Sequence, residues 1–122
     1  MEVKIYHNPR CSKSRETLQL LNKHGIEPIV IDYLNAAPSK EELKKIIRLL
    51  SGNAHSMLRM KETAYKECGL SPESKAGEII AAIQKYPVLL ERPIVVVDNQ
   101  KAAIGRPPEN VRKLILKSSK GR

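Results

Sequence analysis

A β-α-β segment at the start of the chain constrains the fold most. Residues 3–6 (VKIY) form a short apolar run that predicts a buried strand, and residues 26–34 (IEPIVIDYL) predict a second strand. Between these runs, Leu18 and Leu21, with the neighbouring Thr17, supply the apolar face of a predicted helix. Two strands joined by one crossover helix are expected to be parallel, with a right-handed connection.

A block of helices is predicted next, over residues 36–87. Ser39 and Glu42 have the spacing of a capping box, in which each side chain accepts a hydrogen bond from the other residue's backbone N–H. Further helices are expected to end at Gly69 and before Pro87. The apolar positions that recur at helical spacing in this block are Leu43, Ile46, Ile47, Leu50, Ala76, Ile79, Ile80 and Ile83.

A β-hairpin and a helix close the predicted fold. Residues 95–97 and 102–104 flank a short polar loop, and the two prolines that follow open a final helix. The order β-α-β, helices, β-β-α predicts an α/β protein with a thioredoxin-like fold, in which a four-stranded mixed sheet is interrupted by a helical insertion. We expect a single domain over residues 1–122, with a disordered tail at residues 118–122.

The composition fits one aliphatic core and excludes several classes of protein. Hydrophobic residues make up 41% of the 122 residues, and Trp and Phe are absent. No apolar run approaches the roughly 20 residues that span a bilayer, and the charged N-terminus does not resemble a signal peptide, so we expect a cytoplasmic protein. With 2 cysteines, and 3 histidines that lack ligand spacing, neither a structural metal nor another bound cofactor is expected.

The formal net charge of +9 raises the question of an anionic partner. For most of the lysines, a solvated surface is an equally good explanation. Nucleic acid is disfavoured because the only aromatic residues are 4 tyrosines, too few for a stacking platform. A small anion is therefore the better candidate ligand. The predicted elements account for every long amphipathic segment, which leaves none to pair with a second chain, so we expect a monomer.

Cys11 lies where the loop after the first strand meets the first helix. The unpaired N–H groups and the dipole of a helix start stabilise negative charge, which lowers the pKa of a thiol placed there. Arg10, Lys13 and Arg15 act in the same direction if their side chains turn toward the sulfur, and His7 is close enough in sequence to donate to it. The alternative interpretation, a small buried apolar cysteine, does not account for these neighbouring cations.

The spacing of residues around Cys11 excludes two common cysteine motifs. A tyrosine-phosphatase-like loop, C-x5-R, requires an arginine at position 17, which is occupied by Thr17. A dithiol C-x-x-C motif requires a second cysteine at position 14, where Ser14 can hydrogen-bond a thiolate but cannot form a disulfide. The site is therefore predicted to be monothiolic, so a partner must complete any redox cycle. Cys68, near the end of a predicted short helix, is interpreted as a packing residue.

Four stretches together resemble the glutaredoxin-linked arsenate reductase (ArsC) family: KIYHNPRCSKSRETL, MLRMKETAYKECGL, ERPIVV and IGRPPENV. The resemblance covers about residues 2–116 and is greatest to a short branch of ArsC-related proteins. It implies a thioredoxin-like fold with a helical insertion. The residues it assigns to the site are Cys11 as the nucleophile and His7 of the HNP motif as a catalytic residue. Asn8 of the same motif and the three arginines Arg59, Arg92 and Arg106 are expected to bind the substrate, and a cis bond is expected before Pro93.

The activity implied by this resemblance is the reduction of arsenate to arsenite. The Cys11 thiolate attacks arsenic, glutathione adds to the adduct as a co-substrate, and glutaredoxin removes the glutathione as a mixed disulfide. Arginines suit this chemistry because guanidinium groups bind tetrahedral oxyanions through paired hydrogen bonds. The Arg59 side chain is expected to extend from the helical insertion to the bound oxyanion. Phosphate or sulfate could occupy the same oxyanion-binding site, but thiols do not reduce phosphorus(V).

Three other interpretations are open. Spx-like regulators share this fold and bind RNA polymerase, but they commonly carry a C-x-x-C switch where this chain has Ser14. The chain lacks the C-terminal extension of the longer ArsC proteins, so another oxyanion or a glutathionylated protein is an alternative substrate. A plain anion-binding domain with an inert thiol is the third interpretation.

Overall fold

The chain forms two compact units. The first combines Met1–Asp32 with the chain from Arg92 onward, and the second is Tyr33–Glu91. The computed structural model describes residues 1–120, with residues 117–120 described by their backbone alone. The second unit contains the predicted helical insertion and extends a few residues beyond it at both ends.

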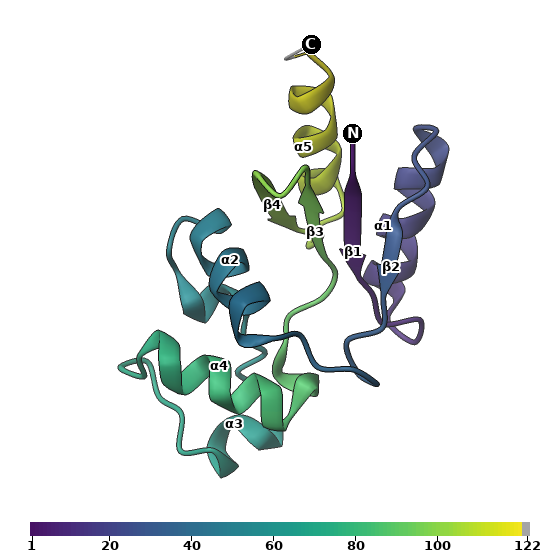
Figure 1. Ribbon diagram of the computed structural model, residues 1–122. Coiled ribbons are helices and arrows are strands. Elements are labelled where there is room, and N and C mark those ends of the chain that lie inside the picture. The colour runs from purple at the N-terminus through teal and green to yellow at the C-terminus, as the bar shows by residue number, and fades with distance from the viewer. Residues whose placement is uncertain (121–122) are drawn as a thin grey trace. The chain divides into compact units, whose positions relative to one another are not determined.

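The first unit is built on a four-stranded mixed sheet with the strand order β2-β1-β3-β4 (Figure 1). β1 (Val3–Tyr6) is parallel to β2 (Ile29–Ile31) and antiparallel to β3 (Ile94–Val97). β3 is in turn antiparallel to β4 (Lys101–Ile104). This pairing confirms the predicted sheet of a thioredoxin-like fold.

Two details of the strands refine the prediction. β2 is shorter than the strand predicted over residues 26–34, because Pro28 directly precedes it and has no N–H to donate to a ladder. The β3–β4 turn contains Asp98 and Asn99, both with a φ of 53°. These left-handed conformations match the twist of a tight hairpin, as the polar loop predicted.

α1 (Ser12–Lys23) and α5 (Glu109–Lys120) pack on one face of the sheet. α1 ends as predicted, at Gly25, whose φ is 75°. Of the tail predicted to be disordered, residues 118–120 continue α5, and residues 121–122 lie outside the described residues. The buried aliphatic cluster between the helices and the sheet, in which each side chain contributes about 1.5–3 kcal/mol, consists of Val3, Ile5, Leu21, Val95, Val97, Val111 and Ile115.

The second unit is helical. The predicted capping box is present: the Glu42 N–H donates to Ser39 Oγ at 3.1 Å, and the Ser39 N–H donates to Glu42 Oε1 at 3.2 Å. Ala76, predicted to lie on an apolar face, is exposed because it is the first residue of its helix. No helix in the described chain is long and apolar enough to cross a membrane. The elements of this unit are α2 (Lys40–Leu49), η1 (Ala54–Met57), α3 (Thr63–Glu67), α4 (Ala76–Lys85) and η2 (Pro87–Leu89).

Candidate active site

Cys11 is the N-cap residue of α1, as predicted. Its backbone is extended, with φ −94° and ψ 123°. The preceding loop is closed by the Cys11 N–H, which donates to Asn8 O at 3.0 Å. Cys11 is 7% exposed. The first N–H groups of α1 therefore lie beside the sulfur of the N-cap residue.

The pKa of the Cys11 thiol lies below its ordinary value. Burial alone would raise this pKa, but hydrogen bonds from the backbone N–H groups of Ser14 and Lys13 stabilise the thiolate. The positive charges of Arg92 and Arg106 lower the pKa further. The groups that bury the sulfur are therefore polar and cationic, which distinguishes Cys11 from an inert packing cysteine.

Arg92 and Arg106 come from the two ends of the β3–β4 hairpin, as predicted. Arg106 Nη2 donates to Cys11 Sγ at 3.4 Å, and Arg106 Nε donates to Arg92 O at 2.8 Å. The peptide bond between Arg92 and Pro93 is cis, which confirms the family expectation. A second cis bond, between Arg106 and Pro107, is not predicted by the sequence analysis. The hairpin thus brings both guanidinium groups to the start of α1.

His7, in the loop before Cys11, and Ser14, in the first turn of α1, form a buried hydrogen-bonded pair. His7 Nδ1 and Ser14 Oγ are 2.6 Å apart, and Ser14 Oγ also accepts the Asn8 N–H at 3.0 Å. Burial lowers the pKa of His7; the charge of Asp32 raises it, and that of Arg15 lowers it. His7 therefore favours the neutral form, and its ring contacts Ser14 rather than the sulfur.

The residues that carry the other predicted cations near Cys11 make contacts of their own, and Lys13 Nζ forms an ion pair with Glu16 Oε2 at 3.5 Å. The Arg10 N–H donates to Asn8 Oδ1 at 3.0 Å, so the Asn8 side-chain oxygen shapes the turn before Cys11. Arg15 does not turn toward the sulfur, because its Nη1 donates to Pro9 O at 2.9 Å. The sequence analysis did not anticipate this contact, which ties the first turn of α1 to the loop.

Thr17 and Gly105 set how closely the hairpin approaches α1. A Cβ atom at Gly105 would lie 2.5 Å from Thr17 Oγ1 and 2.8 Å from Pro93 Cγ. The Gly105 N–H donates to Pro93 O at 2.9 Å, and Thr17 is fully buried. Only glycine fits this space, and it directly precedes Arg106. From the sequence, Thr17 was predicted only on the apolar face of the helix, and neither residue was assigned to the site; the one available signal was a glycine between the last strand and Arg106.

Arg59 and Cys68 lie in the second unit. The Arg59 N–H donates to Leu89 O at 2.8 Å, and the Arg59 guanidinium forms an ion pair with Glu62. Cys68 is the half-buried C-cap residue of α3. Both cysteines of the chain are free thiols. The side chain of Arg59 is thus held by a carboxylate of its own unit.

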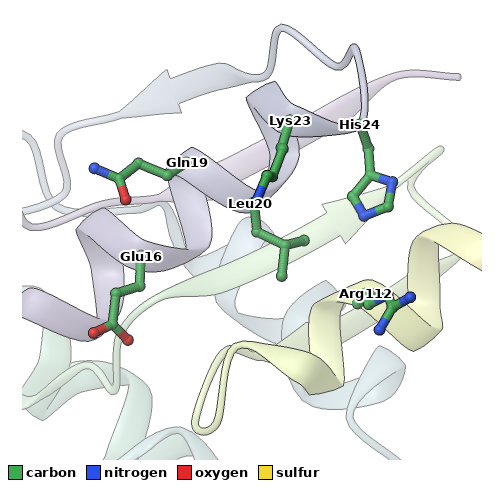
Figure 2. A pocket seen from close by; sticks show the side chains of 6 residues that line it. All are labelled: Glu16, Gln19, Leu20, Lys23, His24 and Arg112. Atoms are coloured by element: carbon green, nitrogen blue, oxygen red, sulfur yellow. The ribbon is translucent and has the colours of Figure 1, made fainter.

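A separate hollow lies between α1 and α5, and Figure 2 shows the side chains around it. None of the predicted site residues lines it. Five of its six side chains are exposed, and the sixth is half-buried, so no buried polar group marks it as a binding site. The hollow is lined by Glu16, Gln19, Leu20, Lys23, His24 and Arg112.

A family match accompanies this geometry. Residues 6–114 match the model of the ArsC family, and the matched range includes every predicted site residue. The chain belongs to the ArsC family. The ArsC motifs identified in the sequence therefore mark the same loop, hairpin ends and helix start that the structure places around Cys11.

Several known ArsC relatives match nearly the whole chain. The chain is 49% identical over 116 residues to the Escherichia coli (strain K12) protein named uncharacterized protein YfgD, covering 93% of this chain and 97% of that protein. It is 49% identical over 112 residues to an arsenate reductase of Neisseria meningitidis, covering 90% and 95%. The solved structure of an arsenate reductase from Vibrio cholerae matches with a TM-score of 0.86 and 50% identity, covering 93% and 97%.

Proposed function

We propose that this chain is an arsenate reductase that depends on glutathione and glutaredoxin. The observation that carries the proposal is the setting of Cys11 Sγ, at the N-terminus of α1 and 3.4 Å from Arg106 Nη2. A thiolate held beside an arginine and helix N–H groups is both a nucleophile and part of an anion-binding site. The names of the relatives from Neisseria meningitidis and Vibrio cholerae support the same substrate.

The first step is attack by the Cys11 thiolate on the arsenic atom of arsenate. A sulfur–arsenic bond forms, and one arsenic–oxygen bond breaks as an oxygen leaves as water after protonation. Arg92 and Arg106 counter the charge of the oxyanion in the transition state, and Arg106 is already held in place by its hydrogen bond to Arg92 O. The N–H groups of Lys13 and Ser14 stabilise the thiolate before the attack.

The second step needs thiols from outside the chain, because position 14 is Ser14 and no resolving cysteine adjoins Cys11. The glutathione thiol bonds to arsenic with loss of a second water. The glutaredoxin thiolate then attacks the glutathione sulfur, and the two electrons of the broken sulfur–arsenic bond reduce arsenic(V) to arsenic(III). Hydrolysis of the Cys11–arsenic bond releases arsenite and regenerates the thiol. The mixed disulfide between glutathione and glutaredoxin is the oxidised product.

The remaining predicted site residues have supporting roles in this proposal. His7 and Ser14 act on the thiol through the loop that they hold, and Asn8 orders the same loop. Arg59 is proposed as a third oxyanion ligand on the strength of the ArsC motif MLR, and an oxyanion would compete with Glu62 for its guanidinium. The protein would work as a cytoplasmic monomer without a bound cofactor, with glutathione as co-substrate.

The test is turnover of arsenate by the purified protein with glutathione, glutaredoxin and NADPH-coupled recycling. We expect arsenite formation that Cys11→Ser abolishes. Cys68→Ser is the matched control, because it removes the other free thiol and should leave turnover intact. Turnover that survives Cys11→Ser, or its absence from the wild-type protein, would contradict the proposal.

An Spx-like role as a regulator that binds RNA polymerase is the alternative function. Ser14 is fully buried and hydrogen-bonded to His7 and Asn8, so this position contributes to the loop and offers no second thiol for a disulfide switch. Co-purification of polymerase subunits with the untreated protein, and not with a Cys11→Ser variant, would favour the regulator.

A further inference from the structure

Asn110 joins two carbonyl groups beside the candidate active site. It lies in the first turn of α5, and its Nδ2 donates to Ile104 O at 3.3 Å and to Arg106 O at 3.2 Å. Both partners are acceptors, so only the NH2 end of the amide can face them. One exposed side chain therefore ties the end of β4 to the main chain of Arg106.

Main-chain hydrogen bonds hold both sides of the segment that carries Arg106, and on the α5 side the Asn110 N–H donates to Pro107 O at 3.0 Å and the Val111 N–H to Pro108 O at 2.9 Å. This segment lies between β4 and α5 and is neither helix nor strand. Pro107 and Pro108 have no backbone N–H, so neither residue can donate a main-chain hydrogen bond. The Gly105 N–H anchors one side of the segment to Pro93 O, and between this bond and those of the helix start the Asn110 side chain holds the Arg106 carbonyl itself.

The position of this backbone decides where the Arg106 guanidinium lies. Arg106 Nε donates to Arg92 O at 2.8 Å, which leaves Nη2 at 3.4 Å from Cys11 Sγ. Because both bonds involve the far end of a long side chain, a small shift of the main chain moves the guanidinium away from the sulfur. A charge displaced from the thiolate stabilises it less.

We propose that Asn110 is a positioning residue that holds Arg106 against the thiolate of Cys11. This proposal rests on the part of the proposed function in which Arg106 stabilises the thiolate and binds the oxyanion. The side chain of Asn110 touches neither the sulfur nor the substrate and acts only through the Arg106 main chain. Removal of the Asn110 side chain allows Arg106 to move and leaves the sheet, α1 and α5 in place.

The test compares Asn110→Leu, which has a similar size and no hydrogen-bond donor, with Asn110→Asp, which presents oxygens to the two carbonyls. The rate of alkylation of Cys11 by iodoacetamide is followed against pH, in the Cys68→Ser background, with and without arsenate. We expect a higher apparent thiol pKa in both variants. Protection by arsenate should weaken by about 2- to 10-fold, the effect of losing one hydrogen bond. Asn22→Leu, which removes an exposed asparagine from the last turn of α1, is the control and should match the parent protein.

A double-mutant cycle separates positioning of Arg106 from a general loss of stability. In an Arg106→Met background, Asn110→Leu should cause no further rise of the thiol pKa, whereas a purely structural effect would persist. Circular dichroism verifies the fold, and Asn110→Ser replaces Asn110→Leu if the latter is unfolded. An unchanged thiol pKa in the folded variant, or an equal shift in the Arg106→Met background, would overturn the proposal. The titration without arsenate tests Asn110 even if the wild-type protein fails to turn over arsenate, which would contradict only the proposed function.

Discussion

The charge on the sulfur of Cys11 depends on groups that are distant in the sequence. The N–H groups of Lys13 and Ser14 come from the same loop and helix, but Arg92 and Arg106 come from the ends of a hairpin more than 75 residues away. Each group lowers the pKa of the thiol against the opposing effect of burial. At the scale of residues, the site is therefore an electrostatic arrangement in which no single side chain acts alone.

The first prediction concerns the ionisation of Cys11. Alkylation by iodoacetamide, measured against pH in a Cys68→Ser background, should reach half its maximum below the value of about 8.5 that is usual for a free thiol. Arg92→Met and Arg106→Met should each raise this midpoint, because both positive charges stabilise the thiolate. Arg10→Met is the matched control, since Arg10 has only a backbone contact in the same loop. A wild-type midpoint at or above the free-thiol value would contradict the prediction.

The second prediction concerns His7 and the pH dependence of stability. Its pKa in the folded chain is lower than in the unfolded chain, chiefly because of burial, so the unfolded chain binds more protons as pH falls through about 6.5. The free energy of unfolding should therefore decrease as pH falls through this region and level off below the folded pKa. Urea unfolding between about pH 5 and pH 7.5 measures this slope.

The variant that tests this assignment is His7→Gln, which removes the titrating ring and should flatten the slope. His24→Gln removes an exposed imidazole from the other end of α1 and is the matched control. If His7→Gln has the same slope as the wild-type protein, His7 is not the group responsible.

At the scale of elements, the close approach of the β3–β4 hairpin to α1 assembles the site. The space between them is so small that Gly105 has no room for a Cβ atom, with Thr17 Oγ1 on one side and Pro93 on the other. Thr17 Oγ1 donates to Lys13 O at 2.8 Å, which keeps this polar group satisfied in the interior. The packing of two elements, rather than the reach of long side chains, therefore brings Arg106 to the sulfur.

The third prediction is that Gly105→Ala disturbs this packing. The added methyl group forces the hairpin and α1 apart, and overpacking of this kind costs about 1–3 kcal/mol of stability. Arg106 moves with the hairpin, so the thiol pKa should rise as it does in Arg106→Met. Gly77→Ala is the matched control, because a Cβ there meets nothing within 4 Å. Chemical denaturation and thiol titration measure the two effects, and wild-type values for Gly105→Ala would contradict the argument.

At the scale of the whole molecule, the chain consists of two compact units, and the second is inserted in the sequence of the first. The sheet unit is made from both ends of the chain, and the helical unit, Tyr33–Glu91, interrupts it. The chain carries a formal net charge of +9, which favours the approach of a small anion. ArsC relatives such as the Neisseria meningitidis arsenate reductase match 90% of this chain, so they span both units.

The fourth prediction follows from the expected single domain over residues 1–122. Thermal unfolding should occur in one cooperative transition, as is usual for single domains below about 150 residues. The helical unit should not fold separately, because a segment of this size has a small core of its own. Calorimetry tests whether unfolding is a single transition by comparing the calorimetric and van't Hoff enthalpies. Two resolved transitions would show that the units unfold independently.

Local signals in the sequence determined most of the elements. The apolar runs predicted β1, β3 and β4, the capping box predicted the start of α2, and Gly25 marked the end of α1. These features depend on residues within a few positions of one another, so they can be recognised without a tertiary structure. The same is true of the position of Cys11 at the start of α1, where it is the N-cap residue, and of the absence of a second thiol at Ser14.

Tertiary structure decided which side chains meet. No local pattern indicates that Gly105 must fit against Thr17, that Arg15 binds Pro9 O rather than facing the sulfur, or that Asn110 holds Arg106. These contacts depend on how the loops, the hairpin and the helices pack in the folded chain. The sequence by itself therefore determined the position of the Cys11 thiol, the absence of a second thiol at position 14 and the order of the elements. Packing decided which charged groups surround the sulfur, because charge stabilisation depends on distances in space.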